Sequence, residues 1–267
     1  MSQHNDVVRE EFTKQAASFA ASPWISDEEM IQRLVSAAGL CGQERVLDVA
    51  CGPGYIAQAF AAVAGEVVGV DLTEAMLAIA RERTSKLGLK NISFRAADVR
   101  SLPFAENEFD VVVCRYALHH MELPAQILGK MARVCRTGGT VLVEDLFASE
   151  NPQRAAYQNK FEILRDSAHT RVLPLSELLQ DFSAVGLEVE AVTMNHRTPE
   201  IERWMATTKT TGEKASEIRR LLADDLARDL SGTRPFYDGE GLLRYVARTA
   251  ILKSHKLLPV RSATHTK

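Results

Sequence analysis

Short apolar runs and longer segments with helical periodicity alternate through the first half of the chain. The apolar runs, which predict buried strands, lie at residues 45–50, 66–71, 91–96, 109–114 and 140–147. The helical segments lie at residues 5–20, 26–38, 55–63, 73–87 and about 124–135. Strands that alternate with helices predict an α/β fold with a parallel, doubly wound sheet, which binds its ligands at the carboxyl ends of the strands.

Polar residues and glycines set the limits of these helices. Ser26 and Glu29 have the spacing of a capping box, and Gly39 follows the helix that they open. Thr73 is expected to cap the helix that ends at Leu87, just before a glycine. A Thr-Gly-Gly turn at residues 137–139 precedes the fifth strand.

The second half predicts a helix at residues 175–185, a strand at 187–197, charge-rich helical material at 200–230 and a strand at 241–253. The basic stretch 254–267 is expected to be frayed. Helical material at 1–38, 148–172 and 199–238 is interpreted as a cap over the sheet edge. The expected organisation is an N-terminal helical cap segment at 1–44, a cofactor-binding core at 45–147, the C-terminal half of the sheet with helical cap insertions at 148–257, and a disordered tail at 258–267.

Composition narrows the class of protein. The 267 residues are 46% hydrophobic, enough for a large core, and the formal charge of −3 gives no reason to expect nucleic acid or an anionic membrane. Residues 1–10 are polar, and no apolar run has the length of a membrane span. The four cysteines, Cys41, Cys51, Cys114 and Cys135, lack the spacing of a zinc site or a disulfide framework. We therefore expect a cytoplasmic protein with reduced thiols.

Acidic residues follow three successive predicted strands. Asp48 lies in the first strand, which runs into the turn Gly52-Pro-Gly54; Asp71 ends the second strand, and Asp98 follows the third. Glycine lets the backbone approach a ligand closely at the sheet edge. A nucleotide-like ligand with ribose hydroxyls fits Asp71.

The residues favour S-adenosylmethionine over NAD as that ligand. Gly52-x-Gly54-x-x-Ala57 formally satisfies the dinucleotide fingerprint. However, Asp48 lies four residues before Gly52, where its carboxylate would repel a pyrophosphate and attract the ammonium and sulfonium of S-adenosylmethionine. Asp98 is placed to accept from an adenine amino group.

Four segments in order, residues 46–54, 69–76, 97–104 and 109–120, resemble the motifs of class I S-adenosylmethionine-dependent methyltransferases, in particular the ubiquinone/menaquinone biosynthesis methyltransferase-like group. Residues 12–19 resemble that group's N-terminal segment, and residues 245–256 its final strand. The resemblance implies a Rossmann-like sheet of seven strands whose last strand is antiparallel, with a helical cap. It implies S-adenosyl-L-methionine as cofactor and S-adenosyl-L-homocysteine as product.

The resemblance also implies roles for individual residues. Asp48, Ala50 and Gly52 would line the methionyl part, Gly54 would shape the turn, and Asp71 would hold the ribose hydroxyls. The other expected cofactor contacts are Leu72 and Met76 on the adenine, Asp98 and Val99 at its edge, and Arg115 (through its backbone) and Tyr116 on the methionine side. Ala50 stands where many members have Gly, and Phe19 where relatives often have Tyr.

Methyl transfer needs a general base only when the acceptor must lose a proton. His119 and His120 follow the fourth strand, at the edge where the acceptor should arrive, and are the candidate catalytic residues, with His119 slightly favoured. This chemistry does not need a metal, and the sequence contains no evident ligand cluster.

The cap is expected to select the acceptor. Phe12, Phe19 and Trp24 are candidates for an aromatic lid, and Arg165, Asp166, His169 and Arg171 for contacts to an anionic substrate; Trp204 and residues 236–237 are candidates for pocket walls. We expect a small, aromatic or quinone-like acceptor, methylated on O, C or N, and a monomer or homodimer. The alternatives are a methyltransferase acting on protein or nucleic acid, a non-catalytic S-adenosylmethionine-binding protein and an NAD-dependent oxidoreductase.

Overall fold

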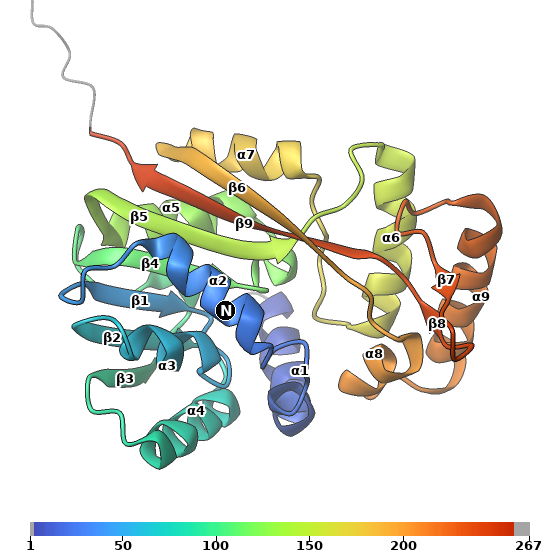
Figure 1. Ribbon diagram of the computed structural model, residues 1–267, viewed down its shortest axis with the longest axis horizontal. Helices are drawn as coiled ribbons and strands as arrows, with labels where there is room; N and C mark the ends of the chain where they lie inside the picture. Colours follow the sequence, from blue (N-terminus) through green and yellow to red (C-terminus); the bar gives the residue numbers. More distant parts are fainter. Residues whose placement is uncertain (1–2, 259–267) are drawn as a thin grey trace, which may run out of the picture.

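A seven-stranded sheet in the order β3-β2-β1-β4-β5-β9-β6 forms the centre of the computed structural model, which describes residues 3–258 (Figure 1). The strands are β1 (Arg45–Val49), β2 (Glu66–Asp71), β3 (Ile92–Ala96), β4 (Phe109–Arg115), β5 (Cys135–Leu146), β6 (Leu187–Arg197) and β9 (Ala247–Lys256). Strands β1 to β5 pair in parallel, whereas β9 pairs antiparallel with both β5 and β6. The predicted doubly wound sheet with an antiparallel last strand is confirmed.

Helices cover both faces of this sheet, because its central strands present apolar side chains to both sides. On one face, α2 (Glu28–Ala38) and α3 (Tyr55–Ala61) pack Leu34 and Phe60 against the sheet. On the other face, α5 (Pro124–Val134) and α7 (Leu175–Ala184) contribute Met131 and Phe182. Packing of these two apolar layers on the sheet fixes the carboxyl ends of the strands relative to one another.

The two helices α2 and α4 begin and end close to the polar residues and glycines that the sequence analysis singled out, but α2 has a different cap residue. Helix α4 (Glu74–Leu87) begins after Thr73 and ends at Gly88, which adopts φ 69° as the sequence predicts. Helix α2 is capped by Asp27, whose side chain accepts from the N–H of Met30 at 3.2 Å, and not by Ser26. Because the cap lies one residue later, the N–H group that it satisfies is that of Met30 and not that of Glu29.

A helical cap lies beyond the carboxyl ends of the strands, on the right in Figure 1. It contains α6 (Pro152–Arg165), α8 (Ile201–Thr207), α9 (Gly212–Arg228) and a hairpin of β7 (Phe236–Tyr237) and β8 (Leu243–Arg244). Phe161, Trp204, Leu222 and Tyr245 form a core of its own. Helix α1 (Gln3–Ala20) lies at the same edge, so the expected cap segment 1–44 divides between α1 at the edge and α2 on the sheet face.

Two other boundaries differ from the sequence prediction. Strand β5 begins at Cys135, and the expected turn at 137–139 is a register irregularity within it, with Gly138 at φ 70°. Strand β9 continues through Lys256, where fraying was expected from residue 254, because its antiparallel pairing with β6 reaches that residue. The expected disordered tail at 258–267 lies, except for Leu258, outside the described residues.

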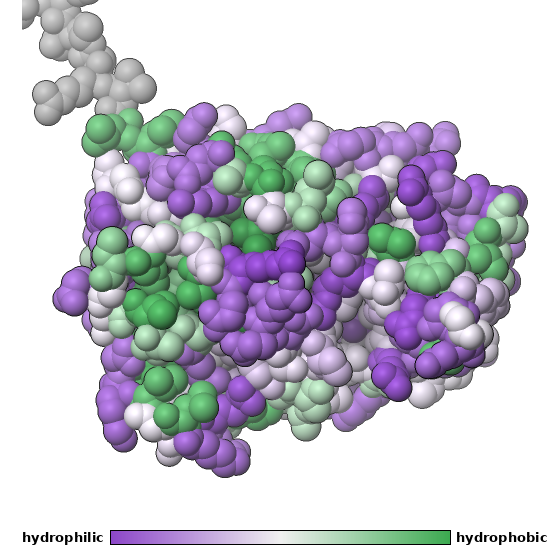
Figure 2. Space-filling view, in the orientation of Figure 1, coloured by the Kyte–Doolittle hydropathy of each residue, from purple (hydrophilic) through white to green (hydrophobic). Residues whose placement is uncertain are grey.

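Hydrophilic side chains dominate the outer surface over α2 in Figure 2, in agreement with the exposed positions Glu28, Glu29 and Gln32 of that helix. Across residues 3–258, no helix is both long and apolar enough to cross a membrane.

Candidate functional site

The turn between β1 and α3 brings backbone atoms to the carboxyl edge of the sheet. Ala50, Gly52 and Gly54 have positive φ angles of 57°, 50° and 82°. The N–H of Cys51 donates to the carbonyl of Val70 at 2.9 Å, which ties the turn to the end of β2. The turn therefore has the left-handed backbone that its glycines predict.

Two residues of this turn are constrained for different reasons, Gly54 by the space around it and Ala50 by its backbone conformation. A Cβ atom on Gly54 would lie 2.9 Å from the Cβ of Ala80 on α4, so only glycine fits there. Ala50 keeps a Cβ in the left-handed region, which is strained for a non-glycine residue. Glycine would adopt this backbone conformation without strain.

Substitutions at these two positions are expected to change stability in opposite directions. Ala50→Gly should raise the free energy of unfolding by about 1 kcal/mol, because it relieves the left-handed strain. Gly54→Ala should lower it by about 1–3 kcal/mol, because the added methyl group overlaps α4. Urea unfolding of both variants measures the two values. A loss of stability in Ala50→Gly would contradict the assigned strain.

Asp48 is a buried carboxyl group, only 1% exposed, at the end of β1. Its Oδ2 atom has no hydrogen-bond partner among the described residues. Burial raises the pKa of Asp48 to about 8, although a hydrogen bond from the N–H of Ala57 acts in the opposite direction. A buried carboxyl with an unused oxygen is suited to a ligand cation.

Asp71 connects the glycine turn to the start of α4. Its Oδ2 accepts from the N–H of Gly52 at 2.8 Å, and its Oδ1 accepts from the N–H of Thr73 at 2.8 Å. Burial raises the pKa of Asp71 despite these bonds. The carboxylate therefore holds the glycine turn against the start of α4, at the edge where a ligand would meet both.

Asp98 reaches the same edge, but its carboxylate already has several donors. Arg100 binds both oxygens, with Nη2 to Oδ2 at 2.7 Å, and Asn5 on α1 donates to Oδ2 at 2.9 Å. Burial acts to raise the pKa of Asp98, but the hydrogen bonds and charge of Arg100 lower it overall. An adenine amino group at Oδ2 would have to replace Asn5.

Glu144 on β5 is a functional residue that the sequence analysis missed. It is completely buried, and it accepts from Nε of Arg115 at 2.7 Å and from the hydroxyl of Tyr116 at 2.9 Å. Arg115 is buried through its side chain, and its Nη2 has no hydrogen-bond partner in the described part of the chain. Tyr116 adopts φ 52°, a strained conformation for a tyrosine at the end of β4.

These residues surround a first cavity of about 260 Å³ at the carboxyl edge. Of the twelve predicted cofactor residues, all except Gly54 line it: Phe19, Asp48, Ala50, Gly52, Asp71, Leu72, Met76, Asp98, Val99, Arg115 and Tyr116. Helix α1 closes one side with His4, Asn5, Val8 and Phe12. The structure thus brings together in one cavity acids that lie 50 residues apart in the sequence, as Asp48 and Asp98 do.

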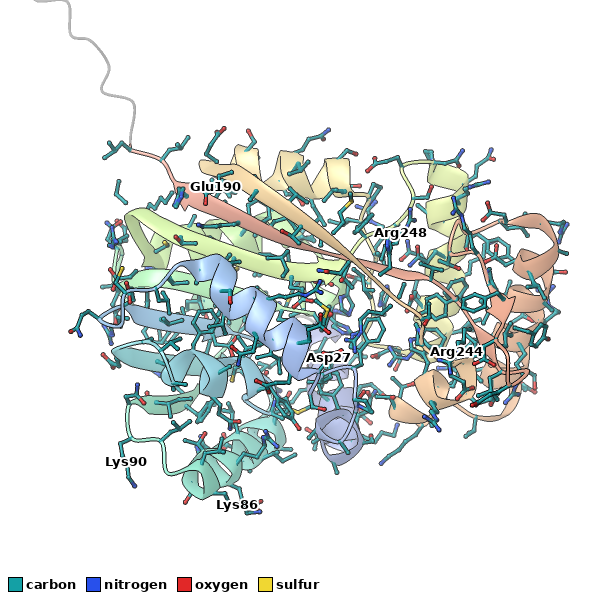
Figure 3. All side chains as sticks on the ribbon, in the orientation of Figure 1. Asp27, Lys86, Lys90, Glu190, Arg244 and Arg248 are labelled. Carbon is teal, nitrogen blue, oxygen red and sulfur yellow. The ribbon has the colours of Figure 1, made fainter. Side chains whose placement is uncertain are left out.

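A second cavity, of about 800 Å³, lies between the sheet edge and the cap. Phe19, Ile25, Tyr116 and His120 line both cavities, so the two adjoin. Asp27 at the start of α2 and Arg244 on β8, both labelled in Figure 3, contribute from the sheet side and the cap side. The arrangement provides one chamber for a nucleotide-like ligand and a neighbouring chamber for a second ligand.

The two candidate catalytic histidines differ in position and charge. His120 lines both cavities, whereas His119 lines only the larger one. The Nδ1 of His119 lies 2.5 Å from Oδ1 of Asp145, and this carboxylate raises the pKa of His119 although burial acts to lower it. Burial and the charge of His119 lower the pKa of His120.

His120 is therefore the neutral member of the pair. Its Nδ1 lies 3.0 Å from the carbonyl oxygen of Ala168, which can only accept, so Nδ1 has the proton. No hydrogen bond to its Nε2 occurs within residues 3–258. The free lone pair of Nε2 lies at the junction of the two cavities.

The structure separates the expected cap contacts. Phe12 lines the first cavity, while Trp24, Trp204, Arg165 and Asp166 line the second. The remaining expected contacts do not line either cavity: His169 packs on His119, Arg171 forms an exposed ion pair with Glu177, and Phe236 and Tyr237 lie in the outer hairpin. The described residues hold no group of His, Cys, Asp and Glu arranged to bind a metal.

A glycine turn and acids at the ends of adjacent parallel strands define a nucleotide-cofactor enzyme of the doubly wound α/β class. A family model for a methyltransferase domain matches residues 42–210. The chain is 30% identical to the uncharacterized methyltransferase YcgJ of Bacillus subtilis over 82% of this chain and 87% of the relative. The crystal structure of that YcgJ protein superposes with a TM-score of 0.80, at 28% identity, over 86% of this chain and 98% of its own.

A further relative is the ubiquinone biosynthesis O-methyltransferase of Acinetobacter baumannii, 31% identical over 64% of this chain and 74% of the relative. The chain therefore belongs to the methyltransferase domain family, within the class I S-adenosylmethionine-dependent methyltransferases. This membership sets aside the alternative of an NAD-dependent oxidoreductase.

Proposed function

We propose that this enzyme binds S-adenosyl-L-methionine in the first cavity and transfers its methyl group to a small organic acceptor in the second cavity. The acceptor is aromatic or quinone-like. When bound, S-adenosylmethionine supplies a methyl group on a sulfonium centre and leaves as S-adenosylhomocysteine.

One buried hydrogen-bond acceptor and one buried donor, both without a partner among the described residues, support this proposal most directly. Oδ2 of Asp48 is an unused acceptor, and Nη2 of Arg115 is an unused donor. Both residues line the first cavity, and they are close enough for the charge of Arg115 to lower the pKa of Asp48. An α-amino acid offers the matching pair, an ammonium for Asp48 and a carboxylate for Arg115. S-adenosylmethionine has such an end and NAD does not.

The remaining residues fit the nucleoside part. Asp71 accepts from the ribose hydroxyls, while Leu72 and Met76 pack on the adenine. Val99 offers its backbone N–H to an adenine nitrogen, and Asp98 accepts from the amino group once Asn5 releases Oδ2. Phe19 and Tyr116 stand at the boundary with the second cavity, where the reacting centre belongs.

A comparison of three ligands by calorimetry tests the cofactor proposal. Wild-type protein should bind S-adenosylhomocysteine about 100-fold more tightly than 5′-methylthioadenosine, which lacks the amino acid end. NAD should show no saturable binding. Equal affinity for S-adenosylhomocysteine and 5′-methylthioadenosine would contradict the role given to Asp48 and Arg115.

His120 is the proposed proton acceptor for any acceptor that must lose a proton. Its Nε2 has a free lone pair at the junction of the cavities, whereas His119 is paired with Asp145. His120→Gln should lower methyl transfer by about tenfold or more and leave the affinity for S-adenosylhomocysteine unchanged. A His119→Gln variant with a larger catalytic defect would reverse the assignment.

The second cavity lies between the sheet edge and the cap, and its volume of about 800 Å³ favours a small acceptor over a protein or nucleic acid. Purified enzyme is incubated with S-adenosylmethionine labelled in its methyl group and with separate fractions of small metabolites, proteins and nucleic acids. The label should appear in the small-metabolite fraction. Label in protein or nucleic acid would contradict the acceptor class, and tight cofactor binding without transfer to any fraction would favour a non-catalytic binding protein.

A further inference from the structure

Guanidinium groups lie over two of the aromatic rings that line the second cavity, Trp24 and Trp204. Arg165 lies over the ring of Trp204 at 4.8 Å, and Arg197 lies over the ring of Trp24 at 4.1 Å. A ring face that holds an arginine is not available to a cationic ligand. These two ring faces are therefore closed to an acceptor with a positive charge.

Most arginines that line this cavity have a carboxylate partner. Arg197 binds Asp27 at 2.7 Å, and Arg33 binds Glu29 at 2.5 Å. Arg203 lies 3.8 Å from Glu200, and Arg244 lies 2.5 Å from Asp238. These four positive charges are balanced within the protein.

Arg165 differs from these four arginines. Its Nε donates to the carbonyl of Trp204 at 3.2 Å, but no carboxylate lies within ion-pair distance of its guanidinium among residues 3–258. Its two terminal nitrogens have no hydrogen bond to the described residues. Stacking on Trp204 fixes the plane of the group, so a pair of parallel donors is held ready on the cavity wall.

The acidic residues near Arg165 do not cancel its charge. Glu162, one helical turn away on α6, is buried, and burial raises its pKa although the charge of Arg165 acts to lower it. Asp166 accepts from the N–H of Ala168 at 2.9 Å, and its charge acts on His119. Neither acid forms an ion pair with Arg165 within residues 3–258, so its terminal nitrogens are open to a ligand in the cavity.

We propose that the second cavity binds a planar aromatic acceptor with a carboxylate group, and that Arg165 binds this carboxylate through its two terminal nitrogens. The assignment rests on the proposed function and defines its acceptor class further. A guanidinium and a carboxylate match in a two-bond geometry, which gives orientation as well as affinity. The ring of the acceptor packs among Tyr116, Trp204 and Tyr245, with Tyr116 toward the cofactor cavity.

Calorimetric titrations with 4-hydroxybenzoate and 4-hydroxybenzamide, each with and without S-adenosylhomocysteine, test this assignment. The two probes have the same ring and size and differ in charge. Wild-type protein should bind the acid at least about tenfold more tightly than the amide, as expected for a charge-assisted bond. Arg165→Gln should bind the acid and the amide with about equal affinity. Arg165→Lys should retain part of the preference for the acid.

Arg203→Gln is the matched control, because it removes the same charge from the same cavity at a residue that pairs with Glu200. It should keep the preference for the acid. Equal binding of the two probes by wild type, binding of neither probe, or an unchanged preference in Arg165→Gln would overturn the assignment. Failure of S-adenosylhomocysteine to bind would instead contradict the proposed function. Unchanged S-adenosylhomocysteine affinity in Arg165→Gln separates a local effect from misfolding.

Discussion

Asp48→Asn is expected to weaken S-adenosylhomocysteine binding by about 100-fold, because it removes the buried carboxylate proposed to hold the ligand ammonium. The affinity for 5′-methylthioadenosine, which has no ammonium, should stay within about twofold of wild type. Calorimetry with the two ligands separates this loss from general damage to the cavity. A parallel loss of both affinities would contradict the assigned contact.

The same substitution should change the pH dependence of binding. The pKa of Asp48 is about 8 in the free protein, so the side chain is mostly protonated at neutral pH. Because the ligand ammonium favours the carboxylate, binding releases a proton, and affinity should rise with pH and level off near pH 8. We expect a gain of up to about tenfold between pH 6.5 and 7.5 in wild type, and none in Asp48→Asn.

Stability should move in the opposite direction from affinity. The pKa of Asp48 is raised above its ordinary value of 3.8, so its contribution to stability is complete below that value and is lost as pH rises to about 8. Asparagine avoids this loss, and the variant should be more stable than wild type at pH 8 by on the order of 5 kcal/mol. Thermal unfolding at pH 5 and pH 8 should show a larger advantage at the higher pH.

Glu144→Gln is expected to lower the free energy of unfolding by about 3–5 kcal/mol. The substitution leaves the buried guanidinium of Arg115 without its carboxylate, and an unpaired buried charge is costly. Urea unfolding measures the loss. Glu217→Gln, which breaks an exposed ion pair with Arg220, is the matched control and should give no resolvable change.

A double substitution identifies the cause of this loss. Glu144→Gln with Arg115→Met removes both charges of this buried pair, so much of the lost stability should return. Binding of S-adenosylhomocysteine should not return, because the proposed carboxylate contact is gone. If the double variant were as unstable as Glu144→Gln alone, the charge of Arg115 would not be the cause.

The sequence allowed the sheet and one wall of the first cavity to be predicted, because local patterns encode both. Asp48, Asp71 and Asp98 each follow an apolar run, and parallel strands bring their carboxyl ends to one edge. The role of Glu144 depends instead on the register that places Arg115 opposite it on β5. An acid inside the apolar run 141–146 was a usable signal, since a buried carboxylate needs a partner.

The acceptor side could not be predicted in the same way. Arg165 and Trp204 are 39 residues apart, and only the folding of α6 against α8 brings them into contact. The preference between the two histidines also depended on tertiary structure. Asp145 pairs with His119 across 26 residues, which leaves His120 as the neutral ring at the cavity junction.

The position of α1 has a consequence for the kinetics of ligand exchange. This helix lines one side of the first cavity, and its Phe12 also contacts the ring of His120 at 5.0 Å. We therefore expect the exchange of a nucleoside of cofactor size to require movement of α1. The observed association rate should level off at high ligand concentration, at the opening rate of the helix, instead of rising in proportion to concentration. Turnover would then have a ceiling set by a hinge motion, however fast the methyl group is transferred.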